Sequence, residues 1–275
     1  MSAAGVNDAI ADLPTGPVFY RDSGGDGVAL VLLHAASGNS LMWEHQIPAL
    51  NGAGYRVVAM DYRGVGGAPG THDWSDQIDA HVMHLNIHRF HLLGTAAGGG
   101  AAFQYALAYP AKVRSLIVAN SHGNVTDKDY VDMGKRLRPS PQFDELPVEF
   151  RELGPSYRAA DPDGVARWLA LSGRKPGADI ASRKAQDESL APPRVGRFAT
   201  RSERKVTWAR LVALQVPTLL ITGDADLYTP PSVLRMFTKR MKAAESAIIP
   251  ETGHSSYWES PGLFNAALLA FLSKH

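Results

Sequence analysis

Residues 90–110, FHLLGTAAGGGAAFQYALAYP, contain a short apolar run, a glycine-rich turn and an alanine-rich helical pattern. Phe90–Leu93 predicts a buried strand, because an apolar run without alternation is typical of a strand covered on both faces. Gly94 and Gly98 flank the turn, and small residues are expected where strand and helix backbones come close together. The stretch therefore predicts a strand, a cramped turn and a helix ending at Pro110, with residue 96 projecting from the top of the sheet.

Strand, turn and helix in this order form the layout of a nucleophile elbow, whose central residue is serine in serine hydrolases. Ala96 occupies that position, and its side chain has neither a nucleophile nor a proton to give. Removing the nucleophile from a catalytic triad lowers the rate by several orders of magnitude, although binding and the oxyanion hole leave a residual activity. We therefore expect that this chain does not form an acyl-enzyme at residue 96.

The composition is that of an ordinary globular protein, with 275 residues, 45% hydrophobic content and a net charge of +1. This length allows one large α/β domain with an inserted subdomain. The near-zero charge gives no reason to expect nucleic acid or an anionic membrane as partner. The absence of cysteine excludes disulfides, thiolate catalysis and cysteine-ligated metal sites.

The N-terminal residues 1–17 lack a basic segment followed by an apolar one, and no run approaches ~18 apolar residues. We therefore expect a cytoplasmic protein whose partner is a small-molecule substrate and which needs no cofactor. Monomer and homodimer both stay open.

Apolar runs alternate with helical patterns over most of the chain. The expected strands are 18–20, 28–33, 55–60, 90–93, 113–119, 218–222 and 247–249, and the expected helices include 42–50, 76–86, 231–241 and 261–273. This alternation predicts an α/β fold with a doubly wound, mostly parallel sheet. Proline and charged residues increase from 120 to 210, where no strand is obvious. We expect a core of residues 1–120 and 211–275 and a helical cap of residues 121–210.

Two candidate catalytic residues follow strands near the C-terminus. Asp226 comes after the strand 218–222, and His254 comes after the strand 247–249. Ligands in open α/β sheets bind beyond the carboxyl ends of strands, so both should converge on Ala96. His254 would be the general base, and Asp226 would orient its imidazole. Backbone N–H groups of Ala36 and Ala97 would form the oxyanion hole.

Several segments resemble motifs of the α/β-hydrolase superfamily at the right place and spacing: LVLLHAASGNSLMWEHQIPAL, YRVVAMDYRGVGGA, HLLGTAAGGG, VRSLIVANS, LLITGDADLYTPP and IPETGHSSYWESP. The resemblance covers nearly the whole chain outside the cap. The W-x-x-Q of residues 43–46 and the ANS of residues 119–121 look most like 3-oxoadipate enol-lactonases and neighbouring esterases. The resemblance implies an ester or lactone substrate, with Asp226 as acid, His254 as base and Ala96 at the nucleophile position.

Candidate substrate-binding residues lie in the core and in the cap. Trp43, Trp168 and Tyr257 would line the pocket, or instead pack the interface between cap and core. Arg158 is the cap residue that we expect to bind a substrate carboxylate. His81, His84, His88 and His91 recur at close spacing, but no acidic partner has ligand spacing, so we expect no metal site.

Two accounts of Ala96 stay open. In one, a serine was replaced by alanine to trap a substrate or product, and the chain is a hydrolase seen without its nucleophile. In the other, Ala96 is native. His254 and Asp226 then serve a lyase, isomerase or cyclase as general base, or the chain is a non-catalytic small-molecule binding protein.

Overall fold

A computed structural model describes residues 5–14, 16–61, 74–172, 174 and 205–275 of the chain. Its central sheet has the strand order β1-β2-β4-β3-β5-β6-β7-β8. The strands are β1 (Asn7–Ala11), β2 (Val18–Asp22), β3 (Ala29–Leu33), β4 (Arg56–Met60), β5 (Phe90–Thr95), β6 (Val113–Ala119), β7 (Thr218–Gly223) and β8 (Glu245–Ile249). Neighbouring strands from β4 to β8 pair in parallel, whereas β1 and β2 pair antiparallel at one edge. The predicted α/β fold with a doubly wound, mostly parallel sheet is confirmed.

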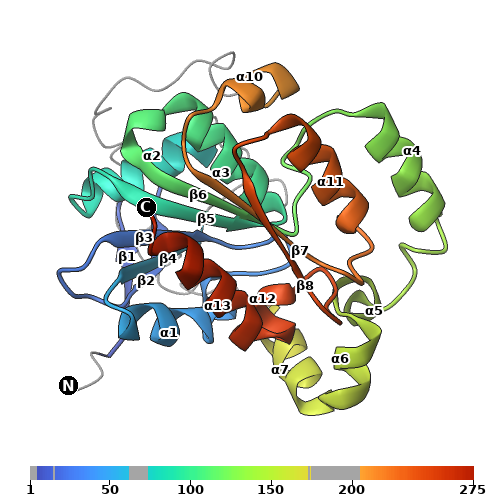
Figure 1. Cartoon of the computed structure of the whole chain (residues 1–275). Coiled ribbons are helices and arrows are strands. Elements are labelled where there is room, and N and C mark those ends of the chain that lie inside the picture. Colours follow the sequence, from blue (N-terminus) through green and yellow to red (C-terminus); the bar gives the residue numbers. More distant parts are fainter. Residues whose placement is uncertain (1–4, 15, 62–73, 173, 175–204) are drawn as a thin grey trace.

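Helices cover both faces of the sheet (Figure 1). One face carries α2 (Trp74–His84), α3 (Ala97–Ala108) and α11 (Pro231–Arg240), and the other carries the 3-10 turn η1 (Ser40–Trp43), α1 (Gln46–Gly52) and α13 (Pro261–Leu272). The strand β3 shows why its sequence is apolar throughout. Val31 and Leu33 join the core on the α3 side, while Leu30 and Leu32 join the core on the α13 side.

Three elements differ from the sequence expectations. The hairpin strand β1 was not predicted, because Asn7–Ala11 is mostly exposed or partly exposed and only its last three residues are apolar. The expected helix over residues 42–50 is divided into η1 and α1. A short helix α12 (Ser256–Glu259) follows His254 directly.

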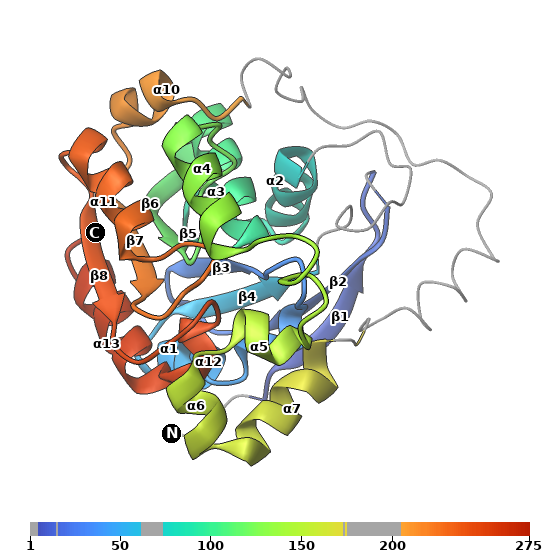
Figure 2. The same cartoon turned by 90° about the vertical axis from the view of Figure 1, so that its right-hand side faces the viewer.

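Four helices follow β6 and lie beyond the carboxyl ends of the strands. They are α4 (Lys128–Leu137), α5 (Val148–Glu152), α6 (Pro155–Ala160) and α7 (Pro162–Ser172). In Figure 1 they lie on the right, toward which the arrowheads of β7 and β8 point, and Figure 2 shows α5, α6 and α7 in front of that edge. These helices occupy the first part of the predicted cap. Residues 175–204 of that cap lie outside the described residues, and α10 (Trp208–Ala213) leads back to the core.

The turn around Ala96 has the close backbone approach that its glycines predict. A Cβ atom on Gly94 would lie 2.1 Å from the carbonyl oxygen of Gly98, and one on Gly98 would lie 2.4 Å from that of Leu33. Ala96 itself has φ 50° and ψ −115°, a sparsely populated conformation for a residue with a side chain. Such a conformation costs on the order of 1–3 kcal/mol and persists only where the surroundings enforce it.

We expect Gly98→Ala to lower the free energy of unfolding by more than about 2 kcal/mol, because its Cβ would press on the backbone at the end of β3. Gly262→Ala in α13 is the matched control, since a Cβ there meets nothing within 4 Å. It should be neutral or slightly stabilising. Chemical denaturation of both variants measures the difference, and equal stabilities would contradict the close approach at the elbow.

Candidate active site

His254 and Asp226 form a buried hydrogen-bonded pair. Nδ1 of His254 lies 2.9 Å from Oδ2 and 3.0 Å from Oδ1 of Asp226. Asp226 is 1% exposed and His254 is 9% exposed. Since a carboxylate accepts and does not donate, Nδ1 carries the proton, which leaves Nε2 of the neutral ring able to accept one.

The loop after β7 holds the Asp226 carboxylate with several donors. Thr229 donates its hydroxyl to Oδ2 at 2.6 Å and its N–H to Oδ1 at 3.0 Å, and the N–H of Tyr228 donates to Oδ1 at 2.7 Å. Burial by itself raises the pKa of Asp226, but His254 and the donors of Thr229 outweigh burial and hold it well below its usual range. Asp226 is therefore ionised across the physiological range.

Asn120, the first residue after β6, joins the loops that carry Asp226 and His254. Its side-chain amide donates to Oδ2 of Asp226 at 3.0 Å and to the carbonyl of Gly253 at 3.1 Å, and its Oδ1 accepts from the hydroxyl of Ser256 at 2.6 Å. The sequence analysis did not assign this residue to the site. The signal available was a polar residue directly after the apolar run of residues 116–119, which ends β6.

The elbow is hydrogen-bonded to the last residue of β6 and to the segment that follows it. The N–H of Ala96 donates to the carbonyl of Ala119 at 3.0 Å, and the hydroxyl of Ser121 donates to the carbonyl of Ala96 at 2.6 Å. Residues 119–121 therefore contact the elbow on one side and, through Asn120, the Asp226 and Gly253 loops on the other. This shared segment brings the three predicted positions to one edge of the sheet.

The predicted oxyanion donors lie at the elbow and after β3. Ala97 is the first residue of α3, so its N–H has no partner within the helix. Ala36 is exposed in the turn that follows β3. A Cβ on Gly98 would meet the carbonyls of Leu33 and His34, which shows that the start of α3 abuts this loop. Burial lowers the pKa of His34 to about 4, so its ring is neutral.

Glu259 holds the backbone around His254 although no sequence signal marked it. Its carboxylate accepts from the N–H groups of Gly253 (2.9 Å), Ser255 (3.2 Å) and Gly154 of the predicted cap (2.7 Å). Burial raises the pKa of Glu259 to about 7, against the lowering effect of these donors. One buried carboxyl is therefore hydrogen-bonded both to the His254 loop and to the segment after α5.

The predicted substrate-binding residues divide into two groups. Trp43, Trp168 and Tyr257 are buried, and the rings of Trp43 and Tyr257 lie 4.8 Å apart. The guanidinium of Arg158 stacks on the ring of Phe150 at 4.0 Å, within the cap itself. A substrate-binding role for these four residues stays a prediction.

Arg138, in the predicted cap, lies beside the loop that carries Asp226 and was not among the predicted site residues. It follows α4 and donates to the carbonyl of Leu227 at 2.7 Å, and its guanidinium lies 5.0 Å from the ring centre of Tyr228. The Tyr228 ring in turn lies 4.5 Å from the ring of His254. A cation and an aromatic ring therefore flank the imidazole on the side of α4.

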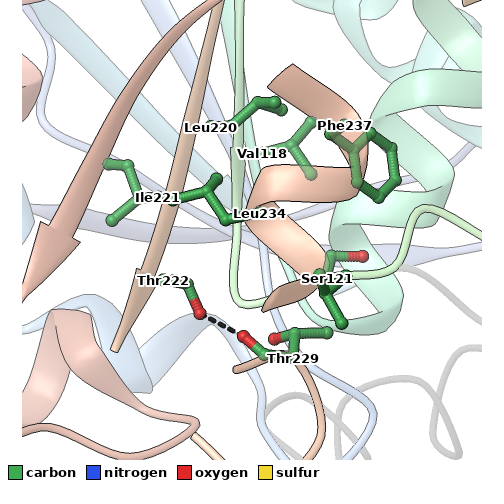
Figure 3. A pocket seen from close by; sticks show the side chains of 9 residues that line it. Val118, Ser121, Leu220, Ile221, Thr222, Thr229, Leu234 and Phe237 are labelled. Atoms are coloured by element: carbon green, nitrogen blue, oxygen red, sulfur yellow. Dashed lines mark hydrogen bonds between the residues drawn. The ribbon is translucent and has the colours of Figure 1, made fainter. Parts of the chain in front are cut away.

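A small cavity of about 10 Å³ lies behind the Asp226 loop, between β6, β7 and α11. Figure 3 shows Thr222, Thr229 and Ser121 at its lower end, where the hydroxyl of Thr222 donates to the carbonyl of Thr229. This volume is close to the minimum that holds one water molecule. The cavity is too small for a substrate, and it lies among the residues that pack behind the Asp226 loop.

The described residues contain neither a metal-binding cluster nor a membrane-spanning helix. None of their histidines and acidic residues gather in groups of three or more that would hold a metal ion. None of their helices is long and apolar enough to cross a bilayer.

We expect Asn120→Asp to lower the free energy of unfolding by on the order of 2–4 kcal/mol at pH 8, because it replaces two donors with a second buried carboxylate beside Asp226. The new carboxyl should have a raised pKa, so the loss should shrink as the pH falls through that value. Urea denaturation between pH 5 and 8 measures this.

Asn124→Asp is the control for that substitution. Asn124 shares the positive φ of Asn120 (59° against 47°) but is exposed. Its replacement should change stability by less than about 0.5 kcal/mol at every pH. Equal effects of the two substitutions would show that Asn120 does not join the loops.

Comparison with known proteins agrees with the observed fold. The model of the alpha/beta hydrolase fold family matches residues 28–261. The chain is 28% identical to a putative carbamate hydrolase RutD of Variovorax paradoxus, over 94% of this chain and 97% of that protein. It is 25% identical to a 2-hydroxy-6-oxononadienedioate/2-hydroxy-6-oxononatrienedioate hydrolase of Burkholderia vietnamiensis, over 94% of this chain and 91% of that protein.

Solved structures share the fold at lower identity. A thermophilic esterase from Thermogutta terrifontis superposes with a TM-score of 0.73 at 22% identity, covering 98% of both chains. The enol-lactonase from Burkholderia xenovorans LB400 superposes with a TM-score of 0.71 at 20% identity, covering 96% of this chain and all of that one. The chain described here belongs to the α/β-hydrolase fold family, and its relatives include proteins named as hydrolases.

Proposed function

We propose that this protein hydrolyses a carboxylic ester or lactone, and that His254 activates the attacking water directly because Ala96 has no nucleophile. The observation that carries the proposal is the intact His254–Asp226 pair beside an elbow that keeps its backbone conformation without its hydroxyl. Relatives named as hydrolases support the reaction class.

The chemistry needs only groups that the chain supplies. Nε2 of His254 removes a proton from water as the oxygen attacks the carbonyl carbon, and the imidazolium is stabilised by Asp226. The N–H groups of Ala97 and Ala36 would hold the oxyanion. When the tetrahedral intermediate collapses, the alkoxide leaves and takes the proton from His254, which returns the base to its neutral form.

A second candidate function uses the same base without attack by water. The missing nucleophile beside an intact dyad also suits proton abstraction from carbon, as in a lyase, isomerase or cyclase. Turnover in D₂¹⁸O separates the two reactions. Hydrolysis places ¹⁸O in the acid product, whereas proton abstraction exchanges substrate hydrogen with solvent deuterium and leaves ¹⁸O out.

Ala96→Ser should make the site competent for acyl transfer, because the elbow would present a hydroxyl at the position that the fold reserves for it. We expect labelling by a fluorophosphonate probe and a rise of at least about 10³-fold in ester or lactone hydrolysis. The control Ala96→Ser/His254→Gln should lose both. A folded Ala96→Ser protein that stays unlabelled and inert across an ester and lactone panel would overturn the proposed reaction class.

The pH dependence should report the ionisation of His254. Burial lowers the pKa of His254, but Asp226 raises it more strongly, with a smaller effect of Glu152, so that it reaches about 8. A general base must be neutral, so the rate should rise with pH through a midpoint near 8 and level off above it. Buffer blanks and His254→Gln give the background rate. A flat profile between pH 6.5 and 9.5 would show that His254 is not the base.

A further inference from the structure

Glu152, the last residue of α5, lies at the contact between the predicted cap and the His254 loop. Its carbonyl accepts a hydrogen bond from the N–H of His254 at 2.8 Å. A Cβ on Gly253 would lie 2.5 Å from the nitrogen of Gly154 and 3.0 Å from the carbonyl oxygen of Glu152. The backbone at residues 152–154 therefore packs directly on the backbone at residues 253–254.

One carboxylate oxygen of Glu152 lacks a hydrogen-bond partner within the described part of the chain. Its Oε2 is buried and has no hydrogen-bond partner among the described residues. A buried carboxyl oxygen without a partner costs free energy, and native proteins keep few such groups. A functional role would account for the retention of this one.

The charges around Glu152 are those of the catalytic pair. Burial raises the pKa of Glu152, His254 and Arg151 lower it, and Asp226 raises it. Its charge in turn raises the pKa of His254 and contributes to the raised pKa values of Tyr228 and Tyr257.

The other groups that face His254 are on different elements. Arg138, after α4, acts in the opposite direction and lowers the pKa of His254. His122, after β6, is neutral near pH 7 because burial lowers its pKa, with a further contribution from His254. The carboxyl of Glu152, on α5, therefore opposes the effect of Arg138 on the pKa of His254.

We propose that Glu152 is a second carboxylate of the active site, which stabilises the protonated form of His254 from the α5 side and so acts as a positioning residue for the base. The inference rests on the proposed role of His254 as base. Asp226 approaches the imidazole edge at Nδ1, whereas Glu152 is joined to the same residue through its backbone. Without a serine hydroxyl at residue 96, the base has to take a proton from a weaker acid, and a second negative charge favours that transfer.

The test follows the titration of the His254 ring by NMR in the full chain without substrate, so that it does not depend on turnover. Glu152→Gln removes the charge and keeps the shape, and His254→Gln assigns the signal. We expect the pKa of His254 to fall by on the order of 0.5 to 1 unit in Glu152→Gln. Glu149→Gln, which removes a charge one turn earlier on α5, should leave it unchanged.

Glu152→Asp is the second variant, because it keeps the charge if Glu152→Gln does not fold. His254 in Glu152→Asp should titrate closer to the unaltered chain than in Glu152→Gln. Three results would each overturn the inference. The pKa of His254 could be unchanged in Glu152→Gln, it could fall equally in Glu149→Gln, or it could fall in Glu152→Asp as far as in Glu152→Gln. If Glu152→Gln lost hydrolysis while the pKa of His254 stayed the same, the result would count against the roles assigned under the proposed function. It would not support an effect of Glu152 on His254.

Discussion

The buried pair of Asp226 and His254 is the interaction on which the rest of the site depends. A carboxylate that is 1% exposed stays ionised only if donors fill its lone pairs, and Asp226 receives them from Thr229, Tyr228 and Asn120. These donors come from the loops after β6 and β7, and His254 comes from the loop after β8. The parallel sheet is what brings those three loops to one edge.

The end of α5 and the residues after it are hydrogen-bonded to the His254 loop. The carbonyl of Glu152 fixes the N–H of His254, and the carboxyl of Glu259 binds the backbone on both sides of the interface at Gly154 and Gly253. A displacement of this segment would therefore move the imidazole itself. These contacts couple the position of the predicted cap to that of His254.

The elbow combines a strained backbone with a side chain that cannot react. Ala96 has a sparsely populated backbone conformation, and its side chain is a methyl group. Ala97 is the first residue of α3, and in the proposed mechanism its N–H would stabilise a developing negative charge there. In the proposed mechanism, electrostatic stabilisation and a general base therefore act without a covalent intermediate at residue 96.

The sequence by itself determined the α/β fold, because apolar runs and helical periodicity specify which residues must leave water. It also indicated Asp226 and His254, because polar residues after buried strands meet at one sheet edge. It did not reveal Asn120, Glu259, Arg138 or Glu152 as parts of the site. Their roles come from contacts between residues 89 to 136 positions apart, or from a loop packed against a helix end. Only the tertiary structure decided these, because burial and hydrogen-bond partners, which set the charge state of a side chain, are properties of the folded chain and not of local sequence.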